Sequence, residues 1–289
     1  MILKLVIFLL LYVCFGYGYD EIQTQLHRVW RNTRTNTDSN PCLKKSLAFK
    51  HEKLEDAFLE KFVLNVMGTS PGYHTMVSNP RLKATLILVK AALVLPAMGD
   101  IVETGVNAGG SACVIMRFLM EYDACHRKFW GFDSFSGFPT TAKEDGVWGV
   151  GGKKGDMAVS QETFEGNLMK WNAWDNSTIV VTKGYFSETL PRSNVSSISL
   201  LRLDGDIFIS TWDALVHLYP KVVPGGYVYV DDYGSFQGCR EAVDRYRSRH
   251  HIWAPLHFIR EENIVGSIRF EAVWWRVPHQ HEHHNITDV

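Results

Sequence analysis

The chain has 289 residues, of which 46% are hydrophobic and 21% are charged, and its formal net charge at pH 7 is −1. This length and composition are enough for one large α/β domain with appendages, and they exclude a chain that is disordered over most of its length. The charge forms no long run of one sign, so it leaves no electrostatic footprint for nucleic acid, and we expect no nucleic-acid partner.

The first residues are typical of a secretory signal peptide. Lys4 precedes an apolar run over 5–15, and the small residues Gly16 and Gly18 follow it. The run is shorter than the roughly 20 apolar residues that span a bilayer core, which favours a cleaved signal peptide over residues 1–18, with an uncleaved anchor as the alternative. We therefore expect the chain in the lumen of the secretory pathway (Golgi or ER) or secreted, with membrane contact only if the leader is retained.

Two helices are predicted after a polar lead-in. Residues 19–41 are rich in Asn, Thr and Arg and have no apolar period, so they are expected to be flexible. Residues 44–67 carry apolar side chains at helical spacing up to Gly68, and a second helix is predicted over 79–95. The predicted catalytic domain covers residues 42–278.

The following segments alternate between strand and helix, which is the pattern of a mainly parallel sheet and of the α/β fold class. A strand at 100–104, a glycine turn and a helix at 111–122 form a nucleotide-binding half-unit. Further strands are predicted at 129–132, 178–182, 198–203 and 227–230, further helices at 162–171, 210–219 and 237–247, and a closing antiparallel pair at 252–258 and 267–276.

A long glycine-rich segment interrupts this alternation. Residues 137–176 far exceed the usual connection of a few residues, so the segment is interpreted as a lid-like insertion, with a disordered surface insertion as the alternative. The chain ends in a His-rich tail at 279–289, which is interpreted as a solvated terminus.

Sequons and cysteines both bear on the lumenal location. Glycosylation sequons begin at Asn176, Asn194 and Asn285, and each carries a glycan only if the chain enters the lumen. Beyond Cys14, four cysteines fit no metal motif and could form two disulfides in any of three pairings. Cys113 lies on the helix predicted at 111–122 and is expected to pack as a small apolar residue. The four are Cys42, Cys113, Cys125 and Cys239.

The turn after the first sheet strand suits an adenosyl ligand. Glu103 precedes Gly105, and Gly109 with Gly110 opens the next helix, where main chain can approach a ligand closely. Asp133 ends the second strand, where it can accept hydrogen bonds from both ribose hydroxyls. Glu103 would repel a diphosphate, so we predict a cationic donor, S-adenosylmethionine, with Glu103 holding its ammonium directly or through water; helix capping is the alternative for Glu103.

Acidic side chains follow two later strands. Asp204, Asp231 and Asp232 are oxygen ligands of the kind that Mg²⁺ or Ca²⁺ prefers. The adjacent pair can reach one ion only if its strand ends there, and a turn or capping role for one of the two is the alternative. Asp206 is the predicted base that takes the proton from a sugar hydroxyl, with capping of the helix near Thr211 as the alternative.

Four sequence segments between about Tyr73 and Arg276 match a known protein family. They read ETGV with GG at 103–110, GFDSFSGFP at 131–139, KGYFSETLP at 183–191, and LRLDGD through LYPK and PGG to VDDYG at 201–234. Together they resemble the macrocin O-methyltransferase family, bacterial enzymes that methylate sugar hydroxyls on macrolide and aminocoumarin antibiotics.

The resemblance implies a Rossmann-like class I methyltransferase with a seven-stranded, mainly parallel sheet and helices on both faces. It implies S-adenosylmethionine as donor, Mg²⁺ at Asp204, Asp231 and Asp232, and Asp206 as the base. It also implies donor contacts from the segment His74-Thr75-Met76. The expected donor site comprises Thr75, Met76, Glu103, Gly105, Gly109, Gly110, Ser111, Asp133, Ser134 and Asp204.

The leader and the sequons separate this chain from cytoplasmic bacterial enzymes, so the antibiotic acceptor is not carried over. We predict a Mg²⁺-assisted O-methyltransferase of the secretory pathway that acts on a hydroxyl of a glycan or a glycosylated small molecule. The sequence leaves open whether the chain forms a homo-oligomer. Two alternatives also stay open. One is a metal-dependent glycosyltransferase in which Asp204-Gly205-Asp206 is a D-x-D motif, and the other is a non-catalytic secreted glycan-binding module.

Overall fold

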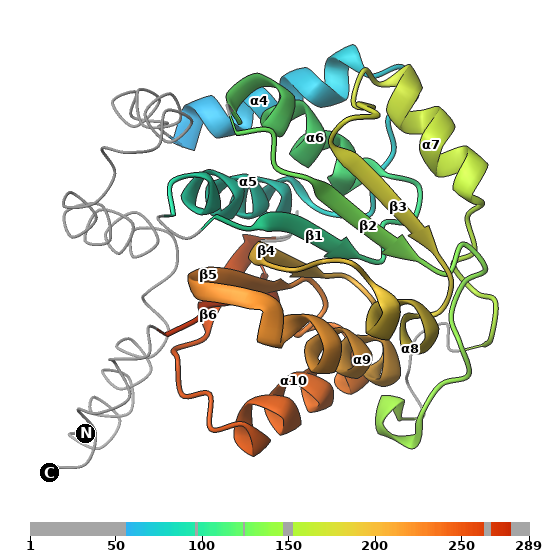
Figure 1. Ribbon diagram of the computed structural model, residues 1–289, viewed down its shortest axis with the longest axis vertical. Coiled ribbons are helices and arrows are strands. Elements are labelled where there is room, and N and C mark those ends of the chain that lie inside the picture. The colour runs from blue at the N-terminus through green and yellow to red at the C-terminus, as the bar shows by residue number, and fades with distance from the viewer. Residues whose placement is uncertain (1–55, 96–97, 124, 147–152, 263–266, 279–289) are drawn as a thin grey trace, which may run out of the picture.

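A seven-stranded sheet between two layers of helices forms the body of the molecule (Figure 1). The computed structural model describes residues 56–95, 98–123, 125–146, 153–262 and 267–278. The strand order is β3-β2-β1-β4-β5-β7-β6, in which the first five strands run parallel and β7 runs antiparallel to both of its neighbours. The predicted seven-stranded, mainly parallel sheet is confirmed.

The central strands are apolar because helices cover both of their faces. Every residue of β4 is buried, and β5 is buried at its last six residues. The seven strands are β1 (Asp100–Thr104), β2 (Phe129–Asp133), β3 (Ile179–Lys183), β4 (Ile198–Leu203), β5 (Val222–Val230), β6 (His257–Glu262) and β7 (Ile268–Arg276).

Two strands start five residues away from their predicted positions, while β2, β3 and β7 differ from the predicted bounds by a single residue at one or both ends. Strand β5 starts at Val222 rather than at 227, because Gly225 and Gly226 continue the strand instead of ending it. Strand β6 starts at His257 rather than at 252. Ile252 instead closes the preceding helix, where its backbone N–H donates to the Arg247 carbonyl (2.8 Å).

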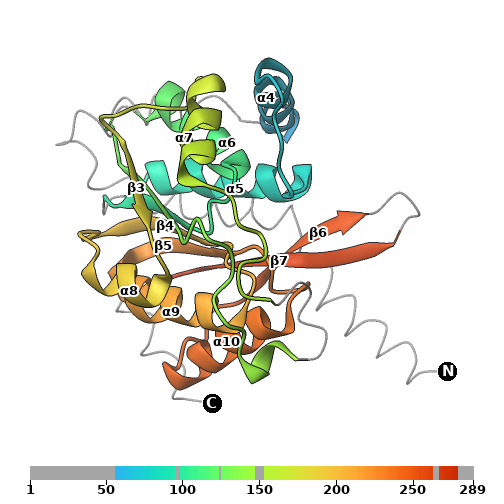
Figure 2. The same ribbon diagram turned by 90° about the vertical axis from the view of Figure 1, so that its right-hand side faces the viewer.

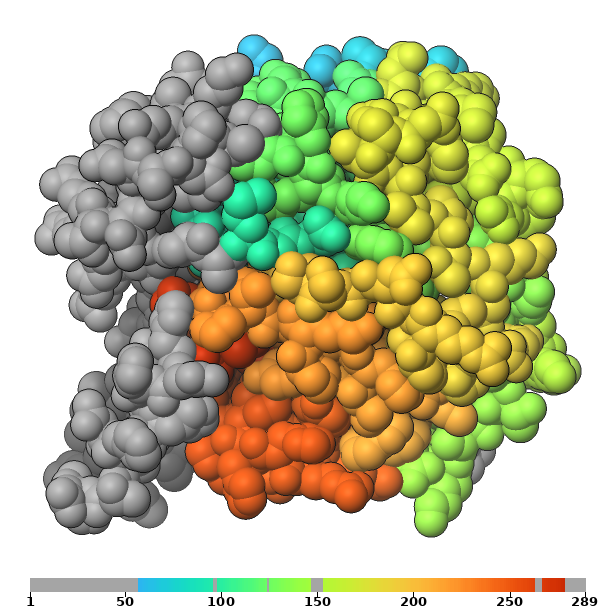
Figure 3. Space-filling view, in the orientation of Figure 1, coloured from blue at the N-terminus to red at the C-terminus, as the bar shows by residue number. Residues whose placement is uncertain are grey.

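Two layers of helices cover the sheet. Helices α4 to α7 lie on one face of the sheet and α8 to α10 on the other (Figure 1), and Figure 3 shows the same arrangement in space-filling form, with the blue to green layer above and the orange layer below. Serine caps start two of them: Ser78 accepts from the Arg81 N–H (3.4 Å) and Ser160 from the Thr163 N–H (3.1 Å). The helices are α4 (Asp56–Thr69), α5 (Asn79–Leu93), α6 (Gly110–Tyr122), α7 (Gln161–Lys170), α8 (Phe186–Thr189), α9 (Phe208–Leu218) and α10 (Gln237–Arg249).

The three-layer arrangement divides the apolar core in two. Leu86 and Phe118 are fully buried between the sheet and the first helical layer, together with Trp171. Leu215 and Trp275 are buried on the opposite side. Because both faces of the sheet are filled with side chains, the carboxyl ends of the parallel strands are where loops can build a ligand site.

The segment predicted to be a lid has two different parts. Helix α7 belongs to the helical layer, since Phe164 and Leu168 are fully buried in the first core. The described residues before it, 137–146 and 153–160, form no helix or strand except for a short 3-10 turn at Lys143–Asp145. The lid therefore remains a prediction only for the residues before α7. Residues 147–152 of that segment lie outside the described residues.

The N-terminal and C-terminal predictions fall outside the described residues. These include the signal peptide, the lead-in, the His-rich tail, the sequon at Asn285 and Cys42. Cys113 is fully buried as predicted, and no disulfide joins it to Cys125 or Cys239. Within the described ranges no helix is long and apolar enough to cross a bilayer.

Candidate active site

A cavity of about 370 Å³ opens at the carboxyl ends of the parallel strands. Its volume lies in the usual range for cofactor and small-molecule sites. Among the described residues that line it, seven are Asp or Glu, and Arg81 is the one Arg or Lys. This excess of carboxylates favours a cationic ligand over a diphosphate.

The wall on the β1 side is built from close backbone contacts. A Cβ on Gly110 would lie 2.6 Å from the His74 carbonyl oxygen and from the Thr75 Cβ, and Tyr73 Oη donates to the Gly110 carbonyl (2.9 Å). The segment before α5 therefore lies directly against the start of α6. The predicted donor residues that line the cavity are Thr75, Met76, Gly105, Gly110, Ser111, Asp133, Ser134 and Asp204.

Gly109 does not line the cavity, contrary to the prediction. It caps α6 in the left-handed conformation (φ +91°), and a Cβ there would meet Phe164 and Leu168 at 3.1 and 3.2 Å. Its lack of a side chain serves the packing of α6 against α7.

Asp133, the predicted ribose ligand, lines the cavity at the end of β2. Its two carboxylate oxygens accept from the backbone N–H groups of Asn107 (2.9 Å) and Phe135 (2.8 Å), which fix the carboxylate at the cavity wall. A carboxylate oxygen can accept more than one hydrogen bond, so these bonds do not exclude a ligand hydroxyl. Burial raises the pKa of Asp133, and the backbone hydrogen bonds partly oppose this effect.

Glu103 lies behind the cavity wall, so the predicted direct contact with a donor ammonium is wrong. The residue is fully buried, and its Oε1 accepts from Ser111 Oγ (2.6 Å) and Arg202 Nη1 (2.8 Å). Burial raises the pKa of Glu103 to about 7, with Arg202 acting in the opposite direction. Oε2 has no hydrogen-bond partner within the described part of the chain. The predicted contact between Glu103 and the donor ammonium through a water molecule therefore remains a prediction.

Arg202 holds the acids of three strands together, and the prediction missed it. Its guanidinium is fully buried and also bonds Asp204 Oδ2 (2.5 Å) and Asp231 Oδ1 (2.8 Å). A buried guanidinium is stable only when carboxylates surround it in this way. The signal in the sequence was a single charged residue inside the apolar run ISLLRL.

Arg81 is a second basic residue that the prediction missed. It bonds Asp231 Oδ2 through Nη1 and Glu261 Oε1 through Nε (2.8 Å), and its Nη2 lies 3.6 Å from Glu271 Oε2. It thereby ties the start of α5 to β5, β6 and β7, whose hairpin projects from the body of the molecule in Figure 2.

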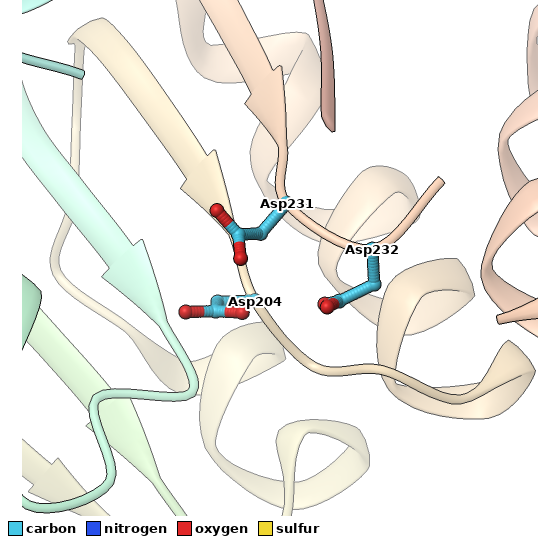
Figure 4. Close-up of side chains that lie close together, drawn as sticks. All are labelled: Asp204, Asp231 and Asp232. Carbon is cyan, nitrogen blue, oxygen red and sulfur yellow. The ribbon is translucent and has the colours of Figure 1, made fainter. Parts of the chain in front are cut away.

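Three aspartates converge at the ends of β4 and β5, as Figure 4 shows. Asp204, Asp231 and Asp232 each offer one oxygen, and these oxygens lie within 4.8 Å of one another. The adjacent pair can converge because β5 ends at Val230, before the alternation of a strand would separate them.

This cluster fits a hard divalent cation. Asp232 Oδ2 is buried with no hydrogen-bond partner in the described ranges, and an oxygen of this kind needs a compensating charge. Burial raises the pKa of Asp204 and of Asp232, and neighbouring carboxylates raise it further. An oxygen-only ligand set is the kind that Mg²⁺ binds.

Asp206 faces the same cavity from the turn after β4 (φ +58°). It does not cap α9, because the Phe208 N–H donates to Asp145 Oδ1 instead (2.7 Å) and the cap residue Ile207 provides no side-chain bond. The capping alternative is therefore wrong. Burial raises the pKa of Asp206 well above its ordinary range, and Asp204 and Asp231 add to the shift.

Gly105→Ala is expected to lower the free energy of unfolding by roughly 3 kcal/mol or more. Gly105 has a φ of +84°, and a Cβ there would lie 1.7 Å from the Asp204 carbonyl oxygen. Urea unfolding measures the effect. The matched control is Gly166→Ala in α7, where no atom lies within 4 Å and alanine should be neutral or stabilising by up to about 1 kcal/mol. Equal stability of the two variants would contradict the close contact.

Comparisons with known proteins find O-methyltransferases. The family model of macrocin-O-methyltransferase (TylF) matches residues 22–276. The chain is 40% identical over 197 residues to demethyldecarbamoylnovobiocin O-methyltransferase of Streptomyces niveus, covering 66% of this chain and 74% of that protein. It is 35% identical over 207 residues to 8-demethyl-8-(2,3-dimethoxy-alpha-L-rhamnosyl)-tetracenomycin-C 4'-O-methyltransferase of Streptomyces olivaceus, covering 70% and 75%. The solved structure of the O-methyltransferase NovP is 30% identical, with a TM-score of 0.65, and covers 78% of this chain and 99% of that one.

Proposed function

The chain belongs to the macrocin-O-methyltransferase family and is an S-adenosylmethionine-dependent O-methyltransferase, and from this premise we propose that it methylates a hydroxyl of a glycan or a glycosylated small molecule with the help of a divalent cation. The observation that carries the proposal is the convergence of Asp204, Asp231 and Asp232 beside Asp206 in one cavity. A sugar acceptor agrees with the name of the Streptomyces olivaceus relative, which contains a rhamnosyl group.

Asp206 is the proposed general base. The bound donor supplies a methyl group on a sulfonium, which an acceptor oxygen attacks as the carbon–sulfur bond breaks. Asp206 takes the proton that the hydroxyl loses, and a carboxylate whose pKa is raised holds that proton better at neutral pH than an ordinary aspartate. Asp133, which backbone hydrogen bonds fix at the cavity wall, would accept hydrogen bonds from the donor ribose.

Asp204, Asp231 and Asp232 would hold the cation, which supplies Lewis-acid chemistry that lowers the pKa of the acceptor hydroxyl. Arg202 and Arg81 keep two of these carboxylates in place through charged hydrogen bonds. The site holds five carboxyl groups, those of Glu103, Asp206 and the three ligands, against two guanidiniums, and a bound cation would offset the mutual repulsion that, in addition to burial, raises the pKa of Asp204, Asp206 and Asp232. Such a balance favours a divalent cation.

Removal of divalent metal is expected to lower the methylation rate by about 10²-fold or more, and added Mg²⁺ should restore it. Asp232→Asn should weaken Mg²⁺ binding in calorimetry, because the buried oxygen without a partner is lost. Asp244→Asn, on the exposed side of α10, is the matched control and should leave binding unchanged. Full activity in metal-free protein would contradict the role of the cation.

The acceptor is tested with labelled donor, Mg²⁺ and a panel of free glycans and glycosylated small molecules. The expected product gains one methyl group on a sugar hydroxyl, detected by mass spectrometry. Donor affinity is measured separately by calorimetry. Tight donor binding without any methylated glycan on a broad panel would count against the sugar acceptor and not against the donor site.

The alternatives from the sequence are less well supported. A glycosyltransferase would place a nucleotide-sugar diphosphate among seven carboxylates, which repel it. A non-catalytic module does not explain membership of a family of O-methyltransferases. A thermal-shift comparison of S-adenosylmethionine with nucleotide sugars separates the two enzymes.

A location in the secretory-pathway lumen is part of the proposal. It is supported by the apolar leader over 1–18 and by the sequons. The tagged full chain expressed in a eukaryotic host should resist external protease in intact microsomes or appear in the medium. Digestion without detergent, with no secreted protein, would contradict this location.

A further inference from the structure

The turn between α7 and β3 carries a glycosylation sequon with an aromatic residue two positions before the asparagine. The five residues read Trp174-Asp175-Asn176-Ser177-Thr178. We propose that Asn176 bears an N-linked glycan and that the first sugar ring packs on the indole of Trp174. The proposal rests on the lumenal location proposed above and is independent of the methyl transfer.

The hydrogen bond between the two side chains fixes how the Asn176 amide points. Trp174 Nε1 lies 2.7 Å from Asn176 Oδ1. An indole N–H only donates, so the atom that it meets must be the amide oxygen and not the nitrogen. Asn176 is exposed, and its Nδ2 makes no hydrogen bond to the described residues. The nitrogen that receives an N-glycan is therefore the atom that remains available.

The turn does not depend on that nitrogen. Asp175 Oδ1 accepts from the Ser177 N–H (2.9 Å) and Oγ (2.8 Å), and Asp175 Oδ2 accepts from Thr178 Oγ1 (3.0 Å). The Asp175 carbonyl accepts from the Ile179 N–H (2.9 Å). A glycan on Nδ2 breaks none of these bonds, so the glycosylated chain can keep the same turn.

Trp174 offers an indole ring directly beside the Asn176 amide. It is half-buried and packs against the first core, so its orientation is fixed before a sugar arrives. Packing the apolar face of a sugar ring on this indole costs little side-chain conformational entropy, because the indole is already ordered; a mobile side chain would first have to be ordered. The contact should therefore stabilise the folded protein.

The second described sequon lacks this arrangement. Asn194 is also exposed, but Arg192 stands two residues before it and Val195 after it is buried. No aromatic ring therefore occupies the corresponding place in the sequence. Asn194 is the internal comparison for Asn176.

A glycan at Asn176 would not obstruct the cavity. The turn precedes β3 and therefore lies at the amino ends of the parallel strands, whereas the cavity lies at their carboxyl ends (Figure 1). Strand β3 is one of the two edge strands of the sheet. The glycan would stand beside this edge, where it would hinder pairing with another chain.

The modification is a group transfer from a lipid-linked oligosaccharide diphosphate. A bond forms between Asn176 Nδ2 and the anomeric carbon of the oligosaccharide, and the bond from that carbon to the diphosphate oxygen breaks. The lipid diphosphate leaves with the electron pair. The amide proton passes to a base of the transferring enzyme.

The test uses the full chain, with its own leader, secreted from a glycosylating eukaryotic host. Enzymatic deglycosylation converts a glycosylated Asn to Asp, so peptide mass spectrometry measures occupancy. Asn176 should be modified in most molecules. Deglycosylation should lower Tm by about 2–4 °C in the natural chain and in Asn194→Gln, and should leave Tm unchanged in Asn176→Gln and in Trp174→Ala.

An unmodified Asn176 in the secreted protein would overturn the proposal. An equal loss of Tm in Trp174→Ala would overturn the packing of the sugar on the indole. A chain retained in the cytosol would overturn the proposal together with the lumenal location. Donor affinity, measured on the same preparations, distinguishes each of these results from a failure of the methyltransferase assignment.

Discussion

Asp206→Asn is expected to lower kcat by about 10²–10⁴-fold and to leave the affinity for S-adenosylmethionine within a few-fold of the natural chain. The side chain faces the cavity, and Asp145 takes the capping role that would otherwise explain it. An amide cannot take the proton from the acceptor hydroxyl. Single-turnover methylation measures the loss, with donor binding followed by calorimetry and Asp244→Asn as the control.

The dependence of the rate on pH tests the same residue. A base acts when it is deprotonated, so the rate should fall as pH drops through the pKa of Asp206 in the folded protein. Because burial and the charges of Asp204 and Asp231 raise this pKa, the fall should occur above the ordinary aspartate range near about 3.9. Saturating Mg²⁺ should move it to lower pH, since the cation offsets those charges. A rate that is retained in Asp206→Asn would rule out the base.

Arg202→Met is expected to lower the free energy of unfolding by about 3–5 kcal/mol, or to prevent folding. The substitution removes the hydrogen bonds that Glu103, Asp204 and Asp231 receive from one buried guanidinium. Urea unfolding measures the loss. Arg245→Met is the matched control, because Arg245 pairs with Glu241 and Glu144 at the surface, and its loss should change stability by less than about 1 kcal/mol.

The loss in Arg202→Met should be smaller at low pH. The pKa of Glu103 is about 7 with Arg202 present, and without the guanidinium it should rise further. At about pH 5 this carboxyl is then protonated and neutral in the folded variant, so its burial costs less than at about pH 8. An equal loss at both pH values would show that packing, and not charge, explains the effect. If the single variant does not fold, Arg202→Met with Glu103→Gln supplies the folded comparison.

Much of the fold and the acid cluster could be predicted because the sequence signals them locally. Strands that are buried on both faces appear as continuous apolar runs, and β1 and β4 were placed at their observed bounds. Acids that directly follow such runs share one edge of a parallel sheet. This is why the convergence of Asp204, Asp231 and Asp232 could be predicted and is confirmed.

The charge partners of these acids could not be predicted, because they depend on register across strands. Glu103 pairs in register with Arg202, and Arg202 pairs with Tyr229. Only this pairing shows that Glu103 faces a guanidinium instead of the cavity. The prediction that Gly109 contacts the donor failed for a similar reason. The residues that leave no room for a Cβ there belong to α7, far along the chain.

Anomalous diffraction from crystals grown with Mn²⁺ and S-adenosylhomocysteine tests the central claim most directly. Manganese takes the same oxygen ligands as magnesium and can be located by its scattering. We predict one ion about 2.0–2.2 Å from oxygens of Asp204, Asp231 and Asp232, with the adenosyl ligand in the same cavity. An ion bound elsewhere, or an adenosyl ligand outside the cavity, would contradict the account.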